Sequence, residues 1–381
     1  MASSPISHAH RRRVRRGALA VAAAVLAATI LTGCDPPTLS TQTVVSGRSH
    51  VWEIVFTPSR TMLWTERGGA IMKRTTGGTV SQVTADLSGL RVAGETGLMG
   101  LAVDPSFSSN RRIYTCMGWT NGSTSDVRVI PWVFNPAGTA LTRLAPIISG
   151  MPATSGRHGG CRLLFDGARR LYVGTGDAAV GTNPQDLGSM GGKILRVNPD
   201  TGAGSPENPF ASSGNAVTRR IFSYGHRNVQ GLAIRPSNAS LWSAEHGPDR
   251  DDEVNRGQGG NFGWNPVPGY NEGVPMTDTA EFPDAVRARW SSGIPTVATA
   301  GIAWLDGDQW GAWDEHLVVA TLKGQRLLLL KPETNGQLTL VETLYQGTFG
   351  RLRAVRLGPD GSLYVGTSNG SNDQIIRVTP G

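Results

Sequence analysis

Short apolar segments alternate with turn signals along the chain from about residue 50 to the C-terminus. One sequence pattern recurs: a turn such as Asp104-Pro105-Ser106, a few residues, and then a short apolar or aromatic strand. The six strands of this kind begin at Leu63, Ile113, Leu171, Leu241, Leu317 and Leu363. Their spacings of 50, 58, 70, 76 and 46 residues lie near the ~40 to 50 residues of a propeller blade once loop insertions are allowed. The pattern predicts an all-β fold, a six-bladed β-propeller of four-stranded antiparallel blades.

A second apolar segment precedes each copy of this pattern, and we expect it to form the innermost strand of its blade. These segments are Val51 to Phe56, Leu98 to Val103, Leu163 to Phe165, Leu232 to Ile234, Ile302 to Leu305 and Leu352 to Leu357. The inner strands of a propeller all run in the same direction along the central channel. Residues just before an inner strand and residues just after a second strand therefore share one mouth of the channel. A single sandwich with irregular repeats is the alternative architecture.

Polar residues from five blades are expected at that mouth. Those at the start of inner strands are Glu95, His158, Arg227, Asn228, Thr296, Arg351 and Arg353. Those after second strands are Asp177, the run Glu245-His246-Gly247-Pro248, and Lys323. Each residue alone is weak evidence, because an isolated histidine before a strand is more often structural than catalytic and an arginine can be a solvated rim charge. Chance, however, would scatter such residues between both ends of the channel. Loops on a rigid scaffold commonly carry function, so this mouth is the candidate site.

The cations in this set suit a small planar polyanion, because guanidinium groups pair with carboxylates in a bidentate manner. The four cations are Arg227, Lys323, Arg351 and Arg353. A neutral imidazole at His158 can take a proton from a substrate hydroxyl, and Asp177 can hold its other nitrogen in the correct tautomer.

Oxygen donors suited to calcium follow the second strand of blade four. The Gly247-Pro248 turn presents main-chain carbonyls, and Asp249, Asp251, Asp252 and Glu253 come next. Calcium is bound by such oxygens. A solvated acidic loop is the alternative interpretation of the same run.

The first 34 residues are typical of an export signal. A basic run from Arg11 to Arg16 precedes an apolar stretch from Ala18 to Leu31, and Leu31-Thr32-Gly33-Cys34 forms a lipobox. We expect Cys34 to be acylated, so that the chain is extracytoplasmic and held at the membrane by its lipid alone, with residues 35–49 as a linker. An ordinary signal peptide or an uncleaved anchor are the alternatives.

The leader also changes the picture of charge and cysteine chemistry. It holds five arginines and no acid, so the formal charge of +7 becomes 7 − 5 = +2, which is not a nucleic-acid signature. The cysteines outside the leader, Cys116 and Cys161, belong to an exported chain, where disulfides persist. We predict that they form a disulfide between adjacent blades, with buried free thiols as the alternative.

From about residue 50 onward the chain resembles the soluble quinoprotein glucose and sorbosone dehydrogenases, including bacterial aldose sugar dehydrogenases. The most specific motifs are Gly225-His226-Arg227-Asn228 with Gln230-Gly231-Leu232-Ala233, and Glu245-His246-Gly247-Pro248 with Asp251-Asp252-Glu253. Looser matches surround Glu95, His158, Asp177, Lys323 and Arg351-Leu352-Arg353.

The resemblance implies oxidation of an aldose sugar at C1 to the lactone, with pyrroloquinoline quinone (PQQ) and Ca²⁺ as cofactors. His158 would be the general base while hydride passes to the quinone, Asp177 would orient His158, and Arg227 would polarise the quinone carbonyl. The implied cofactor-binding residues are Glu95, Asn228, Thr296, Lys323, Arg351 and Arg353. Carbonyls of Gly247 and Pro248 would bind the calcium, with Asp252 and Glu253 as candidates for a second one. The electrons would pass to an external acceptor.

Three positions depart from the best-known glucose enzymes. Arg157 stands where they carry an acid, Glu95 where they carry an amide, and Ile294 where they carry an aromatic residue. These changes put glucose itself in doubt as the substrate. Two other classes stay open: a non-catalytic surface propeller that binds carbohydrate or protein, and a metal-dependent lactonase. The cationic mouth favours the dehydrogenase, since a lactonase would place several carboxylates around its metal.

Overall fold

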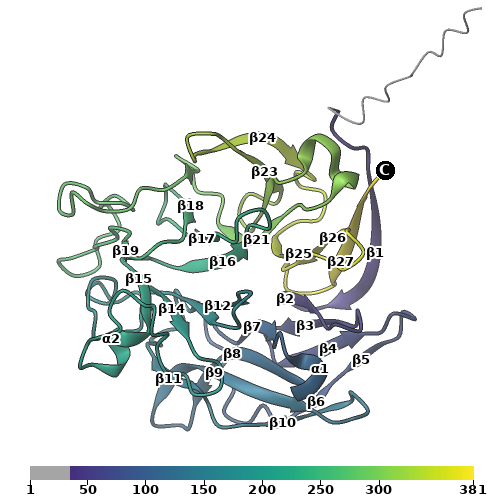
Figure 1. The fold of residues 1–381 in the computed structure, drawn as a ribbon, viewed down its shortest axis with the longest axis horizontal. Coiled ribbons are helices and arrows are strands. Elements are labelled where there is room, and N and C mark those ends of the chain that lie inside the picture. Colours follow the sequence, from purple (N-terminus) through teal and green to yellow (C-terminus); the bar gives the residue numbers. More distant parts are fainter. Residues whose placement is uncertain (1–34) are drawn as a thin grey trace, which may run out of the picture.

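The computed structural model describes residues 35–381, which form six small antiparallel sheets around a central channel (Figure 1). The expected leader, with the lipidation site Cys34, lies outside the described residues. Within residues 35–381, no helix combines the length and the apolar character that crossing a membrane requires.

Each sheet is one blade of a six-bladed β-propeller. Blade one contains β2 (Val51–Phe56), β3 (Met62–Glu66), β4 (Ala70–Arg74) and β5 (Val80–Gln82). Blade two contains β7 (Leu98–Val103), β8 (Arg112–Thr120), β9 (Ser125–Phe134) and β10 (Ala140–Arg143), with the short β6 (Thr84–Ala85) and β11 (Ile148–Met151) beside them. Blade three contains β12 (Gly160–Phe165), β13 (Leu171–Thr175), β14 (Lys193–Val197), β15 (Ile221–Tyr224) and β19 (Gly260–Asn261).

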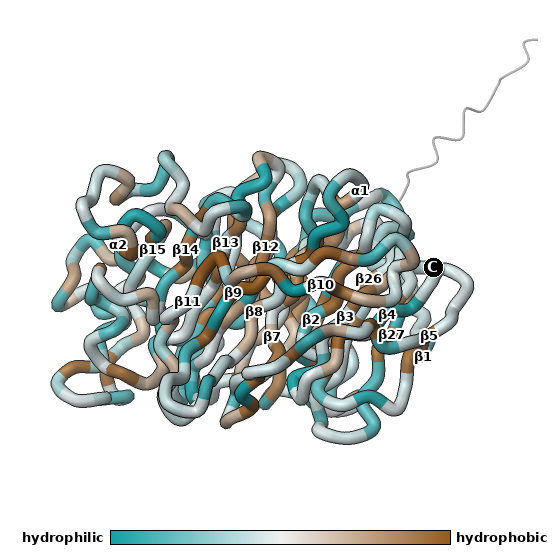
Figure 2. The backbone as a smooth tube through the Cα atoms, turned by 90° about the horizontal axis from the view of Figure 1, so that it is seen from below, coloured by the Kyte–Doolittle hydropathy of each residue, from teal (hydrophilic) through white to brown (hydrophobic). Residues whose placement is uncertain are grey.

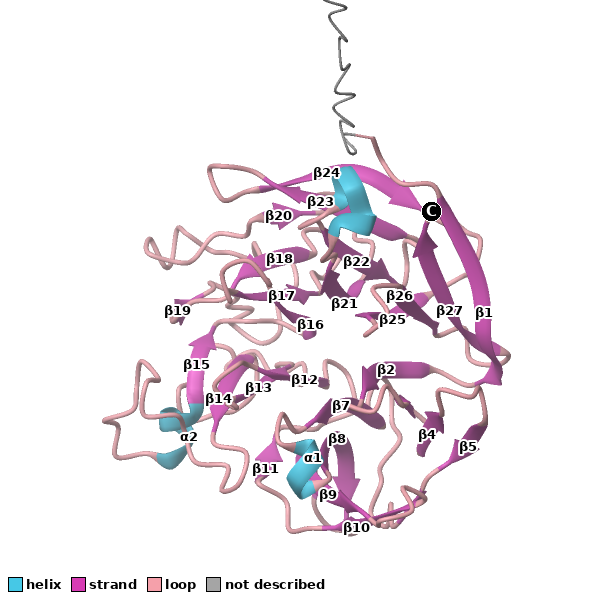
Figure 3. Cartoon of the chain, turned by 45° about the vertical axis from the view of Figure 1, so that its right-hand side comes forward, coloured by secondary structure: helices cyan, strands magenta, loops and turns pink. Residues whose placement is uncertain are grey.

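The second half of the ring repeats this plan. Blade four contains β16 (Val229–Ile234), β17 (Leu241–Glu245), β18 (Glu253–Arg256) and β20 (Trp290–Ser291). Blade five contains β21 (Thr299–Trp304), β22 (Leu317–Thr321), β23 (Leu327–Pro332) and β24 (Leu338–Leu344). Blade six contains β25 (Leu352–Leu357), β26 (Leu363–Thr367), β27 (Asp373–Pro380) and β1 (Leu39–Arg48). The described helices are short: α1 (Phe107–Asn110), α2 (Ala216–Arg220) and a 3-10 helix (Asp308–Trp313) (Figure 3).

The six expected inner strands are confirmed, and neighbouring inner strands contact each other around the ring from β2 to β25 and back to β2. In blades one, two and six their bounds match the expected segments. In blades three, four and five each strand begins three residues earlier than expected, at Gly160, Val229 and Thr299. The earlier starts include glycines and polar residues, which an apolar run alone does not mark.

Glycines let the inner strands approach each other closely. A β-carbon on Gly100 of β7 would lie 2.2 Å from the carbonyl oxygen of Cys161 in β12, and one on Gly231 of β16 would lie 2.3 Å from that of Ala300 in β21. Neither distance is compatible with a side chain unless the blades separate. These glycines therefore set the tight ring that brings polar loops together at the channel mouths.

The N-terminal strand closes the ring, which corrects one expectation. Residues 35–49 were expected to be a linker, but Leu39–Arg48 form β1 and pair antiparallel with β27 as the outer strand of blade six (Figure 1). The register runs from Leu39 opposite Pro380 to Arg48 opposite Asp373. The two ends of the described chain thus share one sheet, which stabilises the ring against opening.

The apolar core lies between the blades as well as inside them. One cluster joins Tyr114 of blade two with Val173 of blade three, and both side chains are fully buried. The tube in Figure 2 shows the strands as the apolar part of the chain and the connecting loops as the polar part. Cys116 of β8 and Cys161 of β12 form a disulfide across the same contact, with Cα atoms 5.8 Å apart.

Candidate active site

The loop before β12 and the loop after β13 bring His158 and Asp177 together. His158 Nδ1 lies 2.8 Å from Asp177 Oδ1, and both side chains are buried. His158 has a φ of 50°, in the left-handed region, so the tight turn before β12 fixes the direction of the imidazole. Asp177 accepts the Nδ1 proton, and Nε2 makes no hydrogen bond within residues 35–381. The pair presents a free, basic ring nitrogen.

Two aromatic residues from a long loop of blade four complete this pair, and the sequence did not predict them. The Tyr270 hydroxyl donates to Asp177 Oδ2 over 2.7 Å and lies 2.9 Å from His158 Nδ1. Trp264 Nε1 donates to the same Asp177 oxygen over 2.8 Å. Burial, followed by the charge of Asp177, raises the pKa of Tyr270 well above its ordinary value, so the phenol stays a donor. With the backbone N–H of Ala179, which donates to Asp177 Oδ1 over 2.8 Å, four groups hold the Asp177 carboxylate.

A hydrogen-bond chain crosses the mouth from blade two to blade six. Asn228 donates from Nδ2 to Glu95 Oε2 over 3.0 Å, and its Oδ1 accepts from Gly160 N and Gln230 Nε2, each over 3.1 Å. Gln230 Oε1 in turn accepts from Arg353 Nη1 over 2.9 Å. Three of the predicted cofactor-binding residues thus belong to one network, and Gln230 joins it as an unpredicted member.

The charges in this network are well defined. Burial alone would raise the pKa of Glu95, but nearby His246, His158, the Asn228 amide and Arg353 together lower it, so Glu95 is ionised at neutral pH. Burial lowers the pKa of Arg353 to about 9, and Arg162 acts in the same direction while Glu95 opposes it. Arg353 is 8% exposed and still protonated at neutral pH. The mouth therefore contains a buried cation that forms no ion pair within residues 35–381.

Arg227 points into the mouth beside this network. Its Nη1 donates to the His246 carbonyl over 3.1 Å, and its Nη2 pairs with Glu272, a residue of the blade-four loop that the sequence did not predict. Glu272 also pairs with Arg157 over 3.2 Å. The buried Nε of Arg227 has no hydrogen-bond partner in the described chain. Arg227 thus keeps one donor that has no partner in the described chain.

The backbone of Arg227 is held by a second histidine–carboxylate pair. His226 Nδ1 lies 2.8 Å from Glu245 Oε1, and Glu245 Oε2 accepts from Arg227 N over 2.8 Å. The other ring nitrogen of His226 lies 2.8 Å from Ser223 Oγ, and the ring stacks on Phe262. This pair is fully engaged, so the motifs at 225–228 and 245–248 serve to hold Arg227 in place.

The remaining predicted cations come from blades five and six. Lys323 Nζ lies 3.3 Å from Thr296 Oγ1, which joins the two predicted residues of blade five. Arg351 is exposed, and its side chain makes no hydrogen bond within residues 35–381. Its backbone N–H donates to Asn369 Oδ1 over 2.8 Å, and its carbonyl accepts from Ser368 N over 2.8 Å. Neither residue bonds directly to the Asn228–Arg353 network within residues 35–381. Ile294, where the resemblance expects an aromatic residue, is 79% exposed.

The Gly247-Pro248 turn fits a cation, and the acid Asp252 after it has other partners. The carbonyls of Gly247 and Pro248 accept no hydrogen bond from residues 35–381, so both oxygens are available. Asp252, a candidate for a second calcium site, accepts hydrogen bonds from the backbone N–H groups of Gly247, Val297 and Ala298. These bonds tie blade four to blade five, and the second calcium site stays a prediction.

Glu253 does not join Asp252 in a common site. It accepts hydrogen bonds from Thr277 over 3.0 Å and from Asn255 over 3.3 Å. Burial, and then the charge of Glu245, raise the pKa of Glu253 to about 8, so the group is mostly protonated at neutral pH. Within residues 35–381 no cluster of three or more histidine, cysteine, aspartate or glutamate side chains is arranged to hold a metal.

Comparison with known proteins gives the family. Residues 48–377 match the family model described as Glucose / Sorbosone dehydrogenase. The chain is 31% identical to an uncharacterised Synechocystis protein over 90% of this chain and 87% of the relative, and 28% identical to the aldose sugar dehydrogenase of Escherichia coli over 91% and 94%. The PQQ-bound aldose sugar dehydrogenase of Streptomyces coelicolor has a similar structure, with a TM-score of 0.73, 27% identity, and coverage of 90% and 100%. The chain belongs to the glucose/sorbosone dehydrogenase family.

Proposed function

We propose that this protein is an oxidoreductase that uses PQQ and Ca²⁺ to oxidise an aldose sugar at C1 to the lactone. The observation that carries the proposal is the His158–Asp177 pair, whose free Nε2 lies at a mouth rich in cations. The family relationship, and the PQQ-bound relative with 27% identity, support the choice of substrate class and cofactor.

The residues at the mouth fit an anionic cofactor. PQQ carries carboxylates, and Arg353 is a buried cation whose only described hydrogen bond goes to an uncharged amide oxygen. Arg353, Arg351, Lys323 and Thr296 would hold the carboxylates, and Asn228 and Glu95 would line the cofactor. Arg227, with its unpaired Nε, would donate to the quinone oxygen. The free carbonyls of Gly247 and Pro248 would hold Ca²⁺. When bound, PQQ supplies a quinone that accepts hydride, and Ca²⁺ supplies a Lewis acid.

The chain itself supplies proton transfer and orientation. His158 Nε2 accepts the proton of the C1 hydroxyl, and Asp177 stabilises the imidazolium that forms. Tyr270 and Trp264 hold the Asp177 carboxylate in the plane of the ring by donating to its other oxygen. Glu272 and Arg157 form an ion pair with exposed side chains, and they would contact the sugar hydroxyls.

Reconstitution tests the proposal. Purified protein is given CaCl₂ and PQQ, and a panel of aldoses is screened with an artificial dye as the external electron acceptor. We expect dye reduction by at least one aldose, formation of the lactone, and loss of activity in His158→Gln. Bound PQQ without turnover of any aldose would contradict the enzyme and favour a binding propeller.

We further propose that the chain is exported and anchored by a lipid on Cys34, with no contact to nucleic acid. The lipobox carries this proposal, and only Asp35 to Thr38 would then separate the lipid from β1. Metabolic labelling with a radioactive fatty acid should mark the wild-type chain and spare Cys34→Ala. Equal labelling of both would contradict the anchor.

A further inference from the structure

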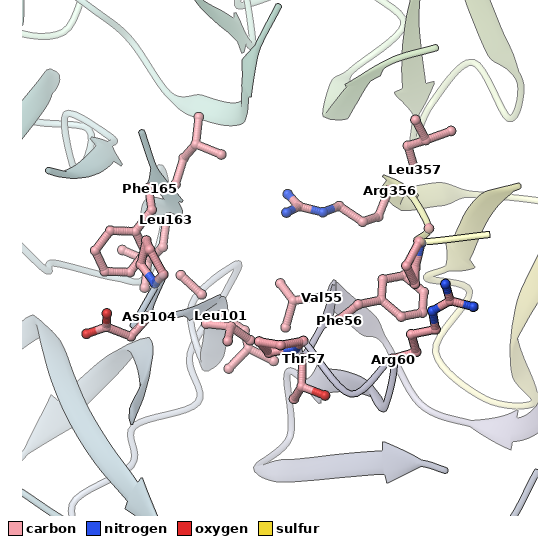
Figure 4. A pocket seen from close by; sticks show the side chains of 17 residues that line it. Val55, Phe56, Thr57, Arg60, Leu101, Asp104, Leu163, Phe165, Arg356 and Leu357 are labelled. Atoms are coloured by element: carbon pink, nitrogen blue, oxygen red, sulfur yellow. The ribbon is translucent and has the colours of Figure 1, made fainter. Parts of the chain in front are cut away.

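The strand β25 carries one arginine toward each end of the channel. Arg353 lies at the mouth that holds His158, and Arg356, three residues later, lies about 10 Å further along the strand. The inner strands all end at this second mouth, which is opposite the proposed catalytic mouth. Figure 4 shows Arg356 reaching from blade six into the open centre of the channel, across from Phe165 of blade three.

Arg356 has no partner of opposite charge in the described chain. The nearest buried acid, Glu53 of β2, pairs with Arg162 of β12, and Arg162 also donates to the Gln230 carbonyl over 2.8 Å. The side chain of Arg356 makes no hydrogen bond or ion pair within residues 35–381. It is half-buried, and burial lowers its pKa, although the charge of Glu53 opposes this effect.

Two cavities meet at Arg356, and most residues on their other walls are apolar in type. The charged exceptions are Arg60 and Asp104 in the first cavity and Asp306 in the second. The first, of about 460 Å³, is lined by the ends of inner strands from blades one, two, three and six, including Val55, Leu101 and Leu163. The second, of about 260 Å³, is lined by blades three to six. Asp104 also borders the first cavity, but its carboxylate is taken by Tyr114 and by Arg169.

We propose that this second mouth binds a small amphiphilic carboxylate, with the carboxylate on Arg356 and an apolar body against the strand ends. The half-buried Arg356 guanidinium has unused donors, and a carboxylate can pair with them in a bidentate manner. The size of the first cavity lies within the range of small-molecule sites. The site is separate from the catalytic mouth and does not depend on the dehydrogenase activity.

The probe is octanoate, with 1-octanol as its uncharged counterpart, titrated calorimetrically into the cofactor-free protein. We expect octanoate to bind wild type and Lys331→Gln equally, since Lys331 is an exposed cation on β23. We expect Arg356→Gln to bind octanoate at least about tenfold more weakly, and 1-octanol to bind both proteins with equal, weak affinity.

The melting temperature distinguishes a ligand-binding role of Arg356 from a purely structural one. Arg356→Gln without ligand should melt close to the wild-type temperature, because the side chain makes no hydrogen bond or ion pair within residues 35–381 that the substitution could remove. Octanoate should raise the melting temperature of wild type and not that of Arg356→Gln. No binding of octanoate to wild type, equal binding to both proteins, or a large loss of stability in the unliganded variant would each overturn the proposal.

Discussion

The Tyr270 hydroxyl and the Asp177 carboxylate lie 2.7 Å apart although they belong to different blades. Asp177 follows β13 of blade three, whereas Tyr270 comes from the long connection between β19 and β20. The orientation of His158 therefore depends on a loop that is distant in sequence. This dependence makes Tyr270 a positioning residue, and it can be tested separately from the base.

Tyr270→Phe should lower kcat about tenfold or more while cofactor affinity is kept, because a hydrogen bond to a charged carboxylate is lost. Tyr345→Phe is the matched control, since the buried Tyr345 hydroxyl has no hydrogen-bond partner in the described chain. Steady-state kinetics with a saturating dye measure both variants. Equal kcat values for Tyr270→Phe and wild type would show that Tyr270 does not position the His158–Asp177 pair.

Lys193 is a buried cation that holds the loop carrying Asp177. Its Nζ donates to the carbonyls of Asn183, Pro184 and Gly191, at 2.6, 3.1 and 2.7 Å. Asn183 Nδ2 in turn donates to the Asp177 carbonyl over 2.8 Å. Lys193→Met should therefore lower the free energy of unfolding by about 1 to 3 kcal/mol per carbonyl left unsatisfied, and loosen Asp177. A circular-dichroism melt checks the stability.

The same lysine predicts a pH dependence. Burial lowers the pKa of Lys193 to about 7, below its ordinary value, so the folded state binds fewer protons than the unfolded state between pH 7 and about 10. Wild-type stability should rise relative to Lys193→Met across this window, by at most about 1.4 kcal/mol per pH unit. Denaturant unfolding of both proteins at pH 7, 8 and 9 measures the difference. A constant difference would show that Lys193 keeps an ordinary pKa.

Removal of the disulfide should change the stability of the fold without changing the candidate active-site residues. Cys116→Ser with Cys161→Ser removes a staple between blades two and three and should destabilise the fold by about 2 to 5 kcal/mol. A tryptic map should show the Cys116 and Cys161 peptides joined without reductant and separate with it. Identical maps under both conditions would mean that the two thiols are free.

The inner strands were predictable because each is a short apolar run next to a turn signal, and that pattern is local. Strand β1 was not predictable in this way: its sequence is largely polar and exposed, and the strand it pairs with, β27, lies more than 300 residues away. The linker expected at 35–49 was therefore wrong. The closure of a ring is a long-range property that local pattern does not reveal.

In the candidate site, too, the residues marked by a local pattern were predictable, and those that depend on long-range contacts were not. His158 and Asp177 were expected to lie together because His158 precedes an inner strand and Asp177 follows a second strand, and both positions lie at the same mouth of a propeller. Tyr270 and Glu272 were not predicted, because their loop has no strand pattern and reaches over a neighbouring blade. Asp252 shows a similar limit, because an acid in a turn looks the same in sequence whether it binds a metal or, as in the structure, accepts hydrogen bonds from backbone N–H groups.

Cofactor binding should follow the cationic mouth. Arg353→Gln should weaken PQQ binding by at least about tenfold, since a charge-assisted pair is lost, and should affect sugar KM less. Calcium with PQQ should raise the melting temperature, and a chelator should reverse the rise. An unchanged melting temperature with saturating PQQ and Ca²⁺ would contradict the assignment of this mouth to the cofactor.

The measurement that tests the central claim most directly is the rate at which an aldose reduces the PQQ-loaded protein in a single turnover, compared between wild type and His158→Gln. The account predicts a fall of roughly a hundredfold or more at unchanged PQQ affinity, because the side chain takes the proton and is not part of the cationic mouth. A wild-type rate in His158→Gln would contradict it and move the proton acceptor to Glu95 or Asp177.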